Sequence, residues 1–227
     1  MSAYVFDTET TGSAVNSEII EAAWMRINDP THQVVEASWE QRFKPSRPIE
    51  LGALAVHHIL DEDLVDCLPS ATFALPSDAA YIIGHNIDYD WNVSGTPNIK
   101  RICTLALSRA YVPNLESYSL SAMIYYFFRL TARGRLKNAH SALADTDNCF
   151  QLLVKLIEVI EKKHETPITS WESLWELSEK ARIPRIMPFG KHKGDAISSL
   201  PKSYQNWLLN QDSIDPYIKQ AIKTQCA

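Results

Sequence analysis

Short apolar runs alternate with polar turns over the first hundred positions of the chain. Residues 3–7, 19–27 and 33–43 predict three consecutive strands, and Asn28-Asp29-Pro30 is a typical turn between the second and the third. Residues 81–84 and 99–103 predict two further strands, and residues 51–60 a short helix. This pattern indicates an antiparallel meander followed by strands that alternate with helices.

The clearest helical period covers residues 140–163. Apolar residues at i, i+3, i+4, i+7, i+8 and i+11 form one stripe, made of Cys149, Leu152, Leu153, Leu156, Ile157 and Ile160. Asp145 lies four residues before Cys149 on that stripe, so we expect its side chain to point toward the core, whereas Asp147 faces solvent. A carboxylate in that position is unfavourable unless it has a partner.

The remaining segments divide the chain into three parts. We expect helices over residues 104–111, 119–128 and 203–210, and a short helix up to about Lys180 that opens with the capping box Thr169-Ser170-Trp171-Glu172. The basic stretch 129–138 is interpreted as a loop, either a solvated one or one that contacts phosphate. The predicted organisation is a main domain over residues 1–164, a linker with a short helix over 165–180, and a small basic extension over 181–227.

Composition narrows the class of protein. The 227 residues suit one domain with an appendage, and no apolar stretch is long enough to cross a bilayer. The four cysteines are far apart, and with no secretory signal visible a reducing cytoplasm is the predicted setting. The net charge of −5 is uneven, with +4 after Ala181 and −9 before it.

Acidic residues are the candidate catalytic groups. Asp7 and Glu9 follow the first apolar run and lie two residues apart, so they share one face of a strand. Together with Asp90 and Asp145 they predict a site for two divalent metal ions that promotes displacement at phosphorus. His140 is a candidate general base. Asp7 and Glu9 are equally consistent with surface residues at a strand end, and spacing alone does not separate Asp90 from Asp88.

The order of these residues resembles the DEDDh 3′–5′ exonuclease superfamily. Its three motifs, D-x-E-T-T-G, H-N-x-x-F/Y-D and H-x-x-x-x-D, match residues 7–12, 85–90 and 140–145, and the second motif selects Asp90 over Asp88. Residues 55–59 are similar to the family's A-x-V-H-x-I segment. Ile102-Cys103-Thr104 and the sequence after Phe189 are similar to the exonuclease X subgroup.

The resemblance implies a ribonuclease H-like α/β fold, with a mixed five-stranded sheet flanked by helices and a small C-terminal extension. It implies that Asp7, Glu9, Asp90 and Asp145 hold two Mg²⁺ ions, for which Mn²⁺ substitutes, and that His140 is the base. Residues in contact with the terminal nucleotide would be Thr10, Thr11, Val56, His57 and Asn86.

The activity implied by the resemblance is removal of nucleoside 5′-monophosphates from free 3′ ends of DNA, in DNA repair. The alternatives are an exoribonuclease of the same fold and a non-catalytic nucleic-acid-binding module. We predict no membrane partner and name no protein partner. The extension also has two interpretations. Phe189, Tyr204 and Trp207 stack on bases beside the lysines around Gly190, or they pack in a small core of their own.

Overall fold

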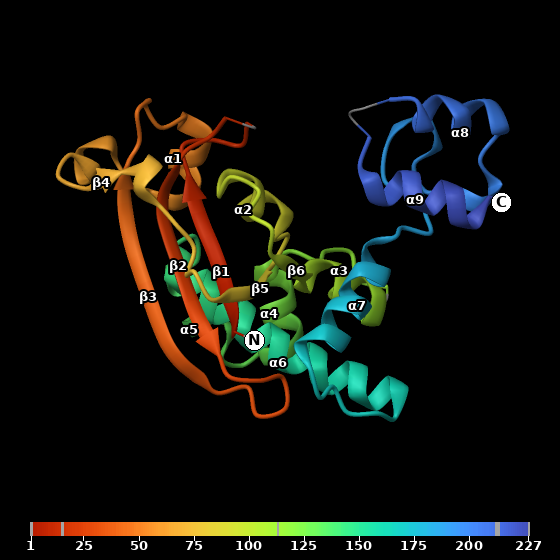
Figure 1. The fold of residues 1–227 in the computed structure, drawn as a ribbon, viewed down its shortest axis with the longest axis horizontal. Coiled ribbons are helices and arrows are strands. Elements are labelled where there is room, and N and C mark those ends of the chain that lie inside the picture. The colour runs from red at the N-terminus through yellow and green to blue at the C-terminus, as the bar shows by residue number, and fades with distance from the viewer. Residues whose placement is uncertain (1, 15, 113, 212–213, 227) are drawn as a thin grey trace. The chain divides into compact units, whose positions relative to one another are not determined.

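A central mixed sheet organises the first part of the chain (Figure 1). The computed structural model describes residues 2–14, 16–112, 114–211 and 214–226. The strands are β1 Ser2–Thr10, β2 Ile19–Ile27, β3 Val35–Lys44, β4 Leu68–Pro69, β5 Ala79–Gly84 and β6 Lys100–Cys103. They lie in the order β4-β3-β2-β1-β5-β6. The pairs β1–β2 and β2–β3 are antiparallel, whereas β1–β5, β5–β6 and β3–β4 are parallel.

Helices cover the sheet and form the C-terminal part. They are α1 Leu51–His57, α2 Asp88–Val93, α3 Thr104–Tyr111, α4 Leu120–Phe128, α5 Ala132–Arg135, α6 Ala142–His164, α7 Trp171–Arg182, α8 Lys202–Leu209 and α9 Pro216–Gln225. The longest, α6, packs on β1 and β2 and also contacts α3 and α4. Among the described residues, no helix is long and apolar enough to cross a membrane.

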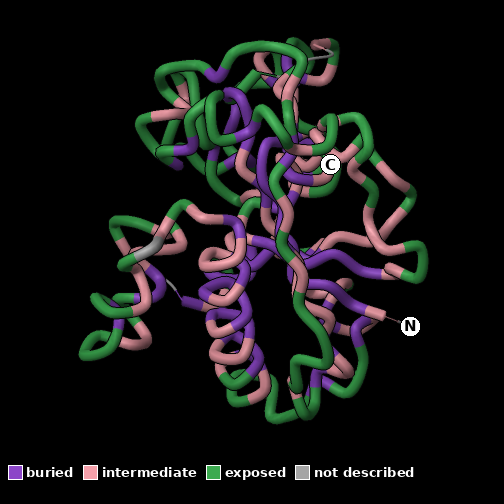
Figure 2. Tube along the Cα trace, turned by 90° about the vertical axis from the view of Figure 1, so that its left-hand side faces the viewer, coloured by how far each residue is buried: buried purple, intermediate pink, exposed green. Residues whose placement is uncertain are grey.

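Burial follows the predicted periods. All six residues of the α6 stripe are buried, as are Val5 and Phe6 of β1. In Figure 2 the buried segments run along the central strands and along one side of the helices that cover them. Aromatic rings gather around the meander, where Trp24 stacks on Trp39 and Phe6 on Phe73. The interior is therefore built from central strands that are buried over continuous runs of residues and from one stripe on the long helix.

The α/β class and the mixed sheet flanked by helices are confirmed, but three details of the prediction are wrong. The sheet has six strands because the two-residue β4 pairs with the end of β3, and so short a strand has no alternation to detect. Residues 129–138 contain α5 and a 3₁₀ turn rather than a loop alone. The first strand does not end at residue 7, because β1 keeps its pairing with β2 as far as Thr10, so both Asp7 and Glu9 lie within it.

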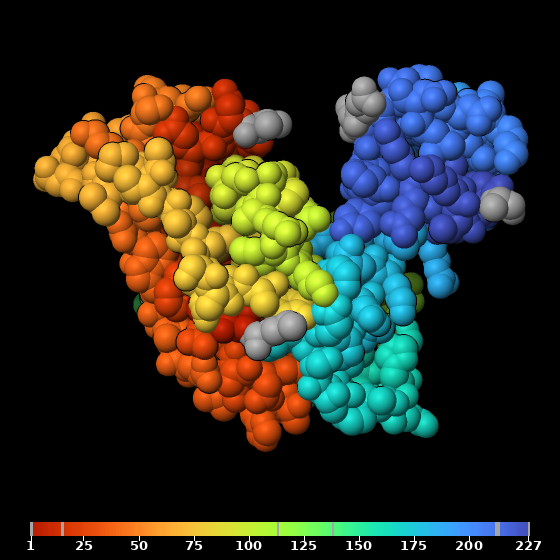
Figure 3. All heavy atoms as spheres, in the orientation of Figure 1, coloured from red at the N-terminus to blue at the C-terminus, as the bar shows by residue number. Residues whose placement is uncertain are grey.

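The chain forms two compact units, residues 1–178 and residues 179–227. The second unit has its own apolar core, made of Met187, Ile197, Leu200, Leu208, Ile218, Ala221 and Ile222. In the space-filling view the atoms of this unit form one closely packed group, drawn in blue (Figure 3). The division into residues 1–164, 165–180 and 181–227 stays a prediction.

Candidate active site

The parallel strands of the sheet bring the three acidic segments to one edge. β1 and β5 run in the same direction, so their carboxyl ends meet at the same edge, where open α/β sheets bind ligands. Asp7 and Glu9 lie in the second half of β1, and the segment that carries Asp90 directly follows β5. The first turn of α6 adds Asp145, since α6 packs across β1 and β2.

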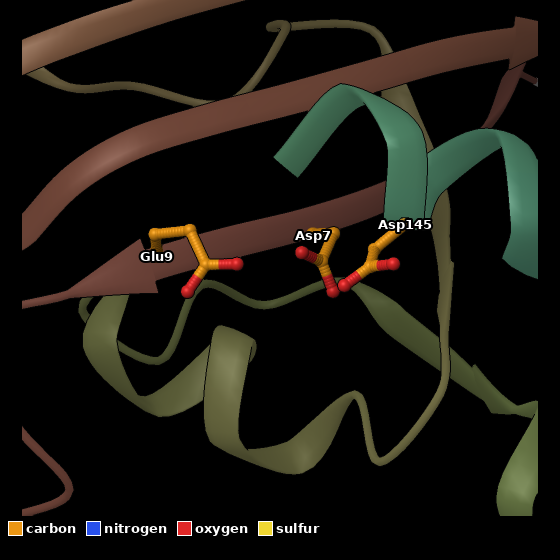
Figure 4. Close-up of side chains that lie close together, drawn as sticks. All are labelled: Asp7, Glu9 and Asp145. Atoms are coloured by element: carbon orange, nitrogen blue, oxygen red, sulfur yellow. The ribbon is translucent and has the colours of Figure 1, made fainter. Parts of the chain in front are cut away.

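Three carboxylates converge at this edge. Asp7, Glu9 and Asp145 each offer one oxygen atom, and these atoms lie within 4.8 Å of one another. The close-up shows the Asp7 and Asp145 carboxylates facing each other, with the Glu9 carboxylate turned toward the same space (Figure 4). All three residues are half-buried, so the cluster is largely enclosed by protein.

Burial and mutual repulsion make the charged form of this cluster unfavourable. Burial, followed by the charges of Asp145 and Glu21, raises the pKa of Glu9 from 4.5 to about 8. The pKa of Asp7 is raised by burial and then by Asp90 and Asp145. The pKa of Asp145 is raised by burial, which the backbone N–H of His140 partly offsets. Converging carboxylate oxygens are the ligands that hard divalent cations prefer, so this donor set fits such an ion.

Asp90 lies close to the cluster but outside the group of three. Its buried carboxylate accepts two hydrogen bonds from Thr8, one from the backbone N–H at 3.0 Å and one from the hydroxyl at 2.7 Å. Burial raises the pKa of Asp90, and the bonds from Thr8 oppose that increase. Asp88 instead forms an ion pair with Arg101 at 2.5 Å. Of the two candidate aspartates, Asp90 is therefore the one that faces the site.

His140 lies at the rim, directly before α6. Its backbone N–H donates to Oδ2 of Asp145 at 3.1 Å, and its φ of 69° is in the left-handed region, which non-glycine residues seldom adopt. The imidazole is exposed. The backbone conformation thus holds the loop against Asp145 and leaves the ring free to meet a ligand from the solvent side.

The two predicted nucleotide-contacting threonines support the loop after β1. Both are buried, and the hydroxyl of Thr10 donates to the carbonyl oxygen of Gly12 at 2.7 Å. The hydroxyl of Thr11 accepts from the backbone N–H of Glu18 at 3.0 Å. In this structure their side chains therefore stabilise the loop.

The other three predicted contact residues lie on two separate segments. Val56 and His57 end α1, and Val56 is 43% exposed whereas His57 is buried, with Nδ1 accepting from the backbone N–H of Ile59 at 3.0 Å. Asn86 is exposed and has a φ of 73°, the second left-handed residue within a motif. Exposed Val56 and Asn86 are thus available to a ligand.

Glu21 is a residue near the site that the sequence analysis missed. It is 2% exposed and lies opposite Glu9 in the β1–β2 ladder. One carboxylate oxygen accepts from the backbone N–H of Ala142 at 2.9 Å, and the other pairs with Nε of Arg42 at 2.8 Å. Glu21 therefore attaches the start of α6 to β2 and holds the first turn of this helix, which carries Asp145, in position. A buried strand position occupied by a charged residue is the sequence signal that would have identified it.

Comparison with known proteins shows the family of the chain. The sequence model described as an exonuclease, RNase T, matches residues 4–153, which is more than half of the chain. The chain belongs to this exonuclease family. This agrees with the exonuclease resemblance that its motifs carry. A second model, described as a putative quorum-sensing-regulated virulence factor, matches residues 177–217. No curated protein matches the chain.

Solved structures show the same fold at low sequence identity. Exonuclease X in complex with 5′ overhanging duplex DNA is 21% identical, with a TM-score of 0.53, over 76% of this chain and 99% of that one. E. coli exonuclease I in complex with a dT13 oligonucleotide is 17% identical, with a TM-score of 0.56, over 72% of this chain and 42% of that one. The nuclease domain of 3′hExo bound to rAMP is 14% identical, with a TM-score of 0.52, over 69% of this chain and 92% of that one.

Proposed function

We propose that this exonuclease is metal-dependent and degrades DNA from free 3′ ends, releasing nucleoside 5′-monophosphates. The convergence of Asp7, Glu9 and Asp145 within 4.8 Å carries the proposal, because three enclosed carboxylates need positive charge to remain ionised together. A role in DNA repair and a cytoplasmic location are parts of the same proposal.

Two divalent cations, Mg²⁺ or Mn²⁺, would be held by the acidic residues. Asp7, Glu9 and Asp145 supply the converging oxygens, and Asp90 assists from the buried position that Thr8 fixes. When bound, such ions supply positive charge that acidifies a water molecule and stabilises the leaving oxygen. The carboxylates orient the reacting groups, and Val56 and Asn86 offer exposed side chains to the terminal nucleotide.

His140 takes the proton from the attacking water. Its exposed imidazole lies on a loop whose backbone is hydrogen-bonded to Asp145, so proton acceptor and acidic cluster keep a fixed connection. The water oxygen then attacks the phosphorus of the terminal phosphodiester, the phosphorus–O3′ bond breaks, and the released O3′ oxygen takes up a proton from solvent to become the 3′ hydroxyl of the preceding nucleotide.

A 5′-labelled oligonucleotide tests the reaction. With magnesium, the full chain should shorten the strand one nucleotide at a time from the 3′ end, and EDTA should stop it. His140→Ala should lower the rate by about 100-fold or more, which is typical for loss of a general base. His32→Ala is the matched control, because His32 is an exposed histidine paired with Asp29 between β2 and β3.

Two results would contradict the proposal. One is an inert wild-type chain on both DNA and RNA, and the other is a His140→Ala variant as active as His32→Ala. A matched RNA oligonucleotide degraded much faster than DNA would change the substrate to RNA and leave the mechanism in place.

A further inference from the structure

Two aromatic side chains of the small C-terminal unit, Trp207 and Phe189, lie outside its core. Trp207 is 50% exposed and Phe189 is 38% exposed, so the interpretation that these two pack in that core is wrong, whereas Tyr204 is half-buried and packs against it. The reason lies in α8, which buries Gln205 and Leu208 against the rest of the unit. Trp207 lies beside that buried stripe, one residue before Leu208, and its ring therefore faces solvent.

Three rings form a continuous row on this surface. Tyr204 and Trp207 are three residues apart on α8, and their rings stack with centroids 5.5 Å apart and planes 18° apart. The His192 ring lies beside Tyr204, with ring centroids 4.6 Å apart and ring planes tilted by 50°. We call these three residues the aromatic row. Stacked rings held in place by each other lose little freedom when a further flat group is added.

Glycine and lysine residues bring positive charge to the aromatic row. Gly190 has a φ of 69°, and a β-carbon there would lie 3.1 Å from the Tyr204 hydroxyl, so the loop passes close to that side chain. The ammonium group of Lys191 lies 5.2 Å from the centre of the Tyr204 ring, and Lys193 is exposed on the same loop. Asp195 is the nearby acid, and it pairs with Nδ1 of His192 at 2.9 Å.

The charge of the unit agrees with an anionic ligand. Residues 179–227 carry a formal charge of +4, whereas the rest of the chain carries −9. Flat ring faces beside lysines match single-stranded nucleic acid, because unpaired bases stack on aromatic rings while lysines neutralise phosphates. In a duplex the base faces are covered, so only the lysines would contribute.

We propose that the aromatic row, together with Lys191 and Lys193, binds single-stranded nucleic acid by base stacking. This inference rests on the proposed function, since it describes how the C-terminal unit holds the same class of substrate. It adds a binding surface that is separate in the chain from the acidic cluster.

Binding of a labelled oligothymidylate to the full chain in EDTA tests the surface without degradation of the strand. Trp207→Leu keeps an apolar side chain but removes the π-face, and it should weaken binding about tenfold, as expected for the loss of one stacked base. Trp207→Phe keeps a ring and should retain most of the affinity. An oligouridylate distinguishes RNA from DNA, and weaker binding of Trp207→Leu to either strand supports the surface.

The role of Lys191 is tested by how strongly the binding affinity depends on salt concentration. Lys191→Ala should reduce the slope of log affinity against log salt by about 0.7, the value for one single-strand phosphate contact. Lys223→Ala removes the same charge from an exposed position on α9 and should leave both affinity and slope nearly unchanged. Thermal melts of each variant show whether the unit remains folded.

Three results would overturn the proposal. The first is a folded Trp207→Leu variant that binds oligothymidylate as tightly as wild type. The second is an equal loss of affinity in Trp207→Phe and Trp207→Leu. The third is a loss of affinity in Trp207→Leu that is as large for a closed hairpin duplex as for the single strand. Hydrolysis of the p-nitrophenyl ester of thymidine 5′-monophosphate monitors the acidic cluster separately. Wild-type chain that binds the strand but hydrolyses neither ester nor DNA would refute the proposed function and leave the binding surface intact.

Discussion

Repulsion within the acidic cluster should make the stability of this protein depend on divalent metal and on pH. The pKa of Glu9 is raised from 4.5 to about 8. At about 1.4 kcal/mol per pKa unit, ionising Glu9 in the metal-free fold costs roughly 5 kcal/mol. Because part of the side chain is open to solvent, we reduce this value to about 2–4 kcal/mol.

The direction of the pH effect follows from which state binds more protons. Between pH 4.5 and about 8 the folded chain binds more protons at Glu9 than the unfolded chain, so stability falls as pH rises through that window. His85 acts in the opposite sense, because burial lowers its pKa to about 4 and folding stability then rises with pH between 4 and 6.5. Between pH 6.5 and 8 the change in stability therefore comes from the acidic cluster and not from His85, and the melting temperature of the metal-free protein should fall across this window.

Divalent metal should reverse this loss. At a concentration 100 times the dissociation constant a cation adds about 2.7 kcal/mol, which raises the melting temperature by roughly 5–10 °C in a chain of this size. Asp145→Asn removes one ligand and one charge, so its metal-free form should be about 1–2 kcal/mol more stable than wild type at pH 8. Its metal-induced shift should be less than half of the wild-type shift.

Asp147→Asn is the matched control on the same helix. The Asp147 side chain is 45% exposed and pairs with Arg135 at 3.4 Å, so its loss should change stability by less than about 1 kcal/mol and leave the metal shift intact. Differential scanning calorimetry with and without magnesium measures both quantities. The reasoning is refuted if metal-free melting temperature rises from pH 6.5 to 8, or if the two variants show the same metal shift.

Three further substitutions test how the site is held. Glu21→Ala should lower the free energy of unfolding by about 1–3 kcal/mol, because the buried N–H of Ala142 loses its acceptor, whereas Glu21→Gln should lose less. Urea unfolding measures both variants, and equal losses of stability would contradict this role of Glu21. Thr8→Val removes the hydroxyl bond to Asp90 and should reduce metal-dependent nuclease activity roughly tenfold, measured as the initial rate on a labelled strand; an unchanged rate would contradict it. Gly84→Ala would place a β-carbon 2.9 Å from the carbonyl oxygen of Phe6, so the urea midpoint should fall by the equivalent of about 1–3 kcal/mol, and an unchanged midpoint would show that the strands shift freely.

Much of the acidic cluster could be predicted because local periodicity decides which way a side chain points. Alternation places Asp7 and Glu9 on one face of β1, and the stripe from Cys149 to Ile160 turns Asp145 inward. The structure brings these three residues together as the spacing implied. Their catalytic roles stay a prediction, as do the nucleotide contacts.

Contacts between segments that are far apart in the sequence could not be predicted from local patterns. Glu21 reaches Ala142 across 121 positions, and Thr8 reaches Asp90 across 82. Neither pairing leaves a periodic trace in the sequence, since each depends on the order of strands and on the helix that crosses them. The same holds for α5, which contains the buried Ala132 and packs against α4 in a stretch whose polar composition indicated a loop.

By itself, the sequence determined the motif order, the strand and long-helix periods, and the inward direction of Asp145, because backbone geometry sets these within a few residues. Tertiary structure alone decided that Glu21 attaches α6 to β2 and that Trp207 lies outside the C-terminal core. An eight-residue helix such as α8 presents more than one apolar stripe, and only the neighbours available to pack against it select which stripe is buried.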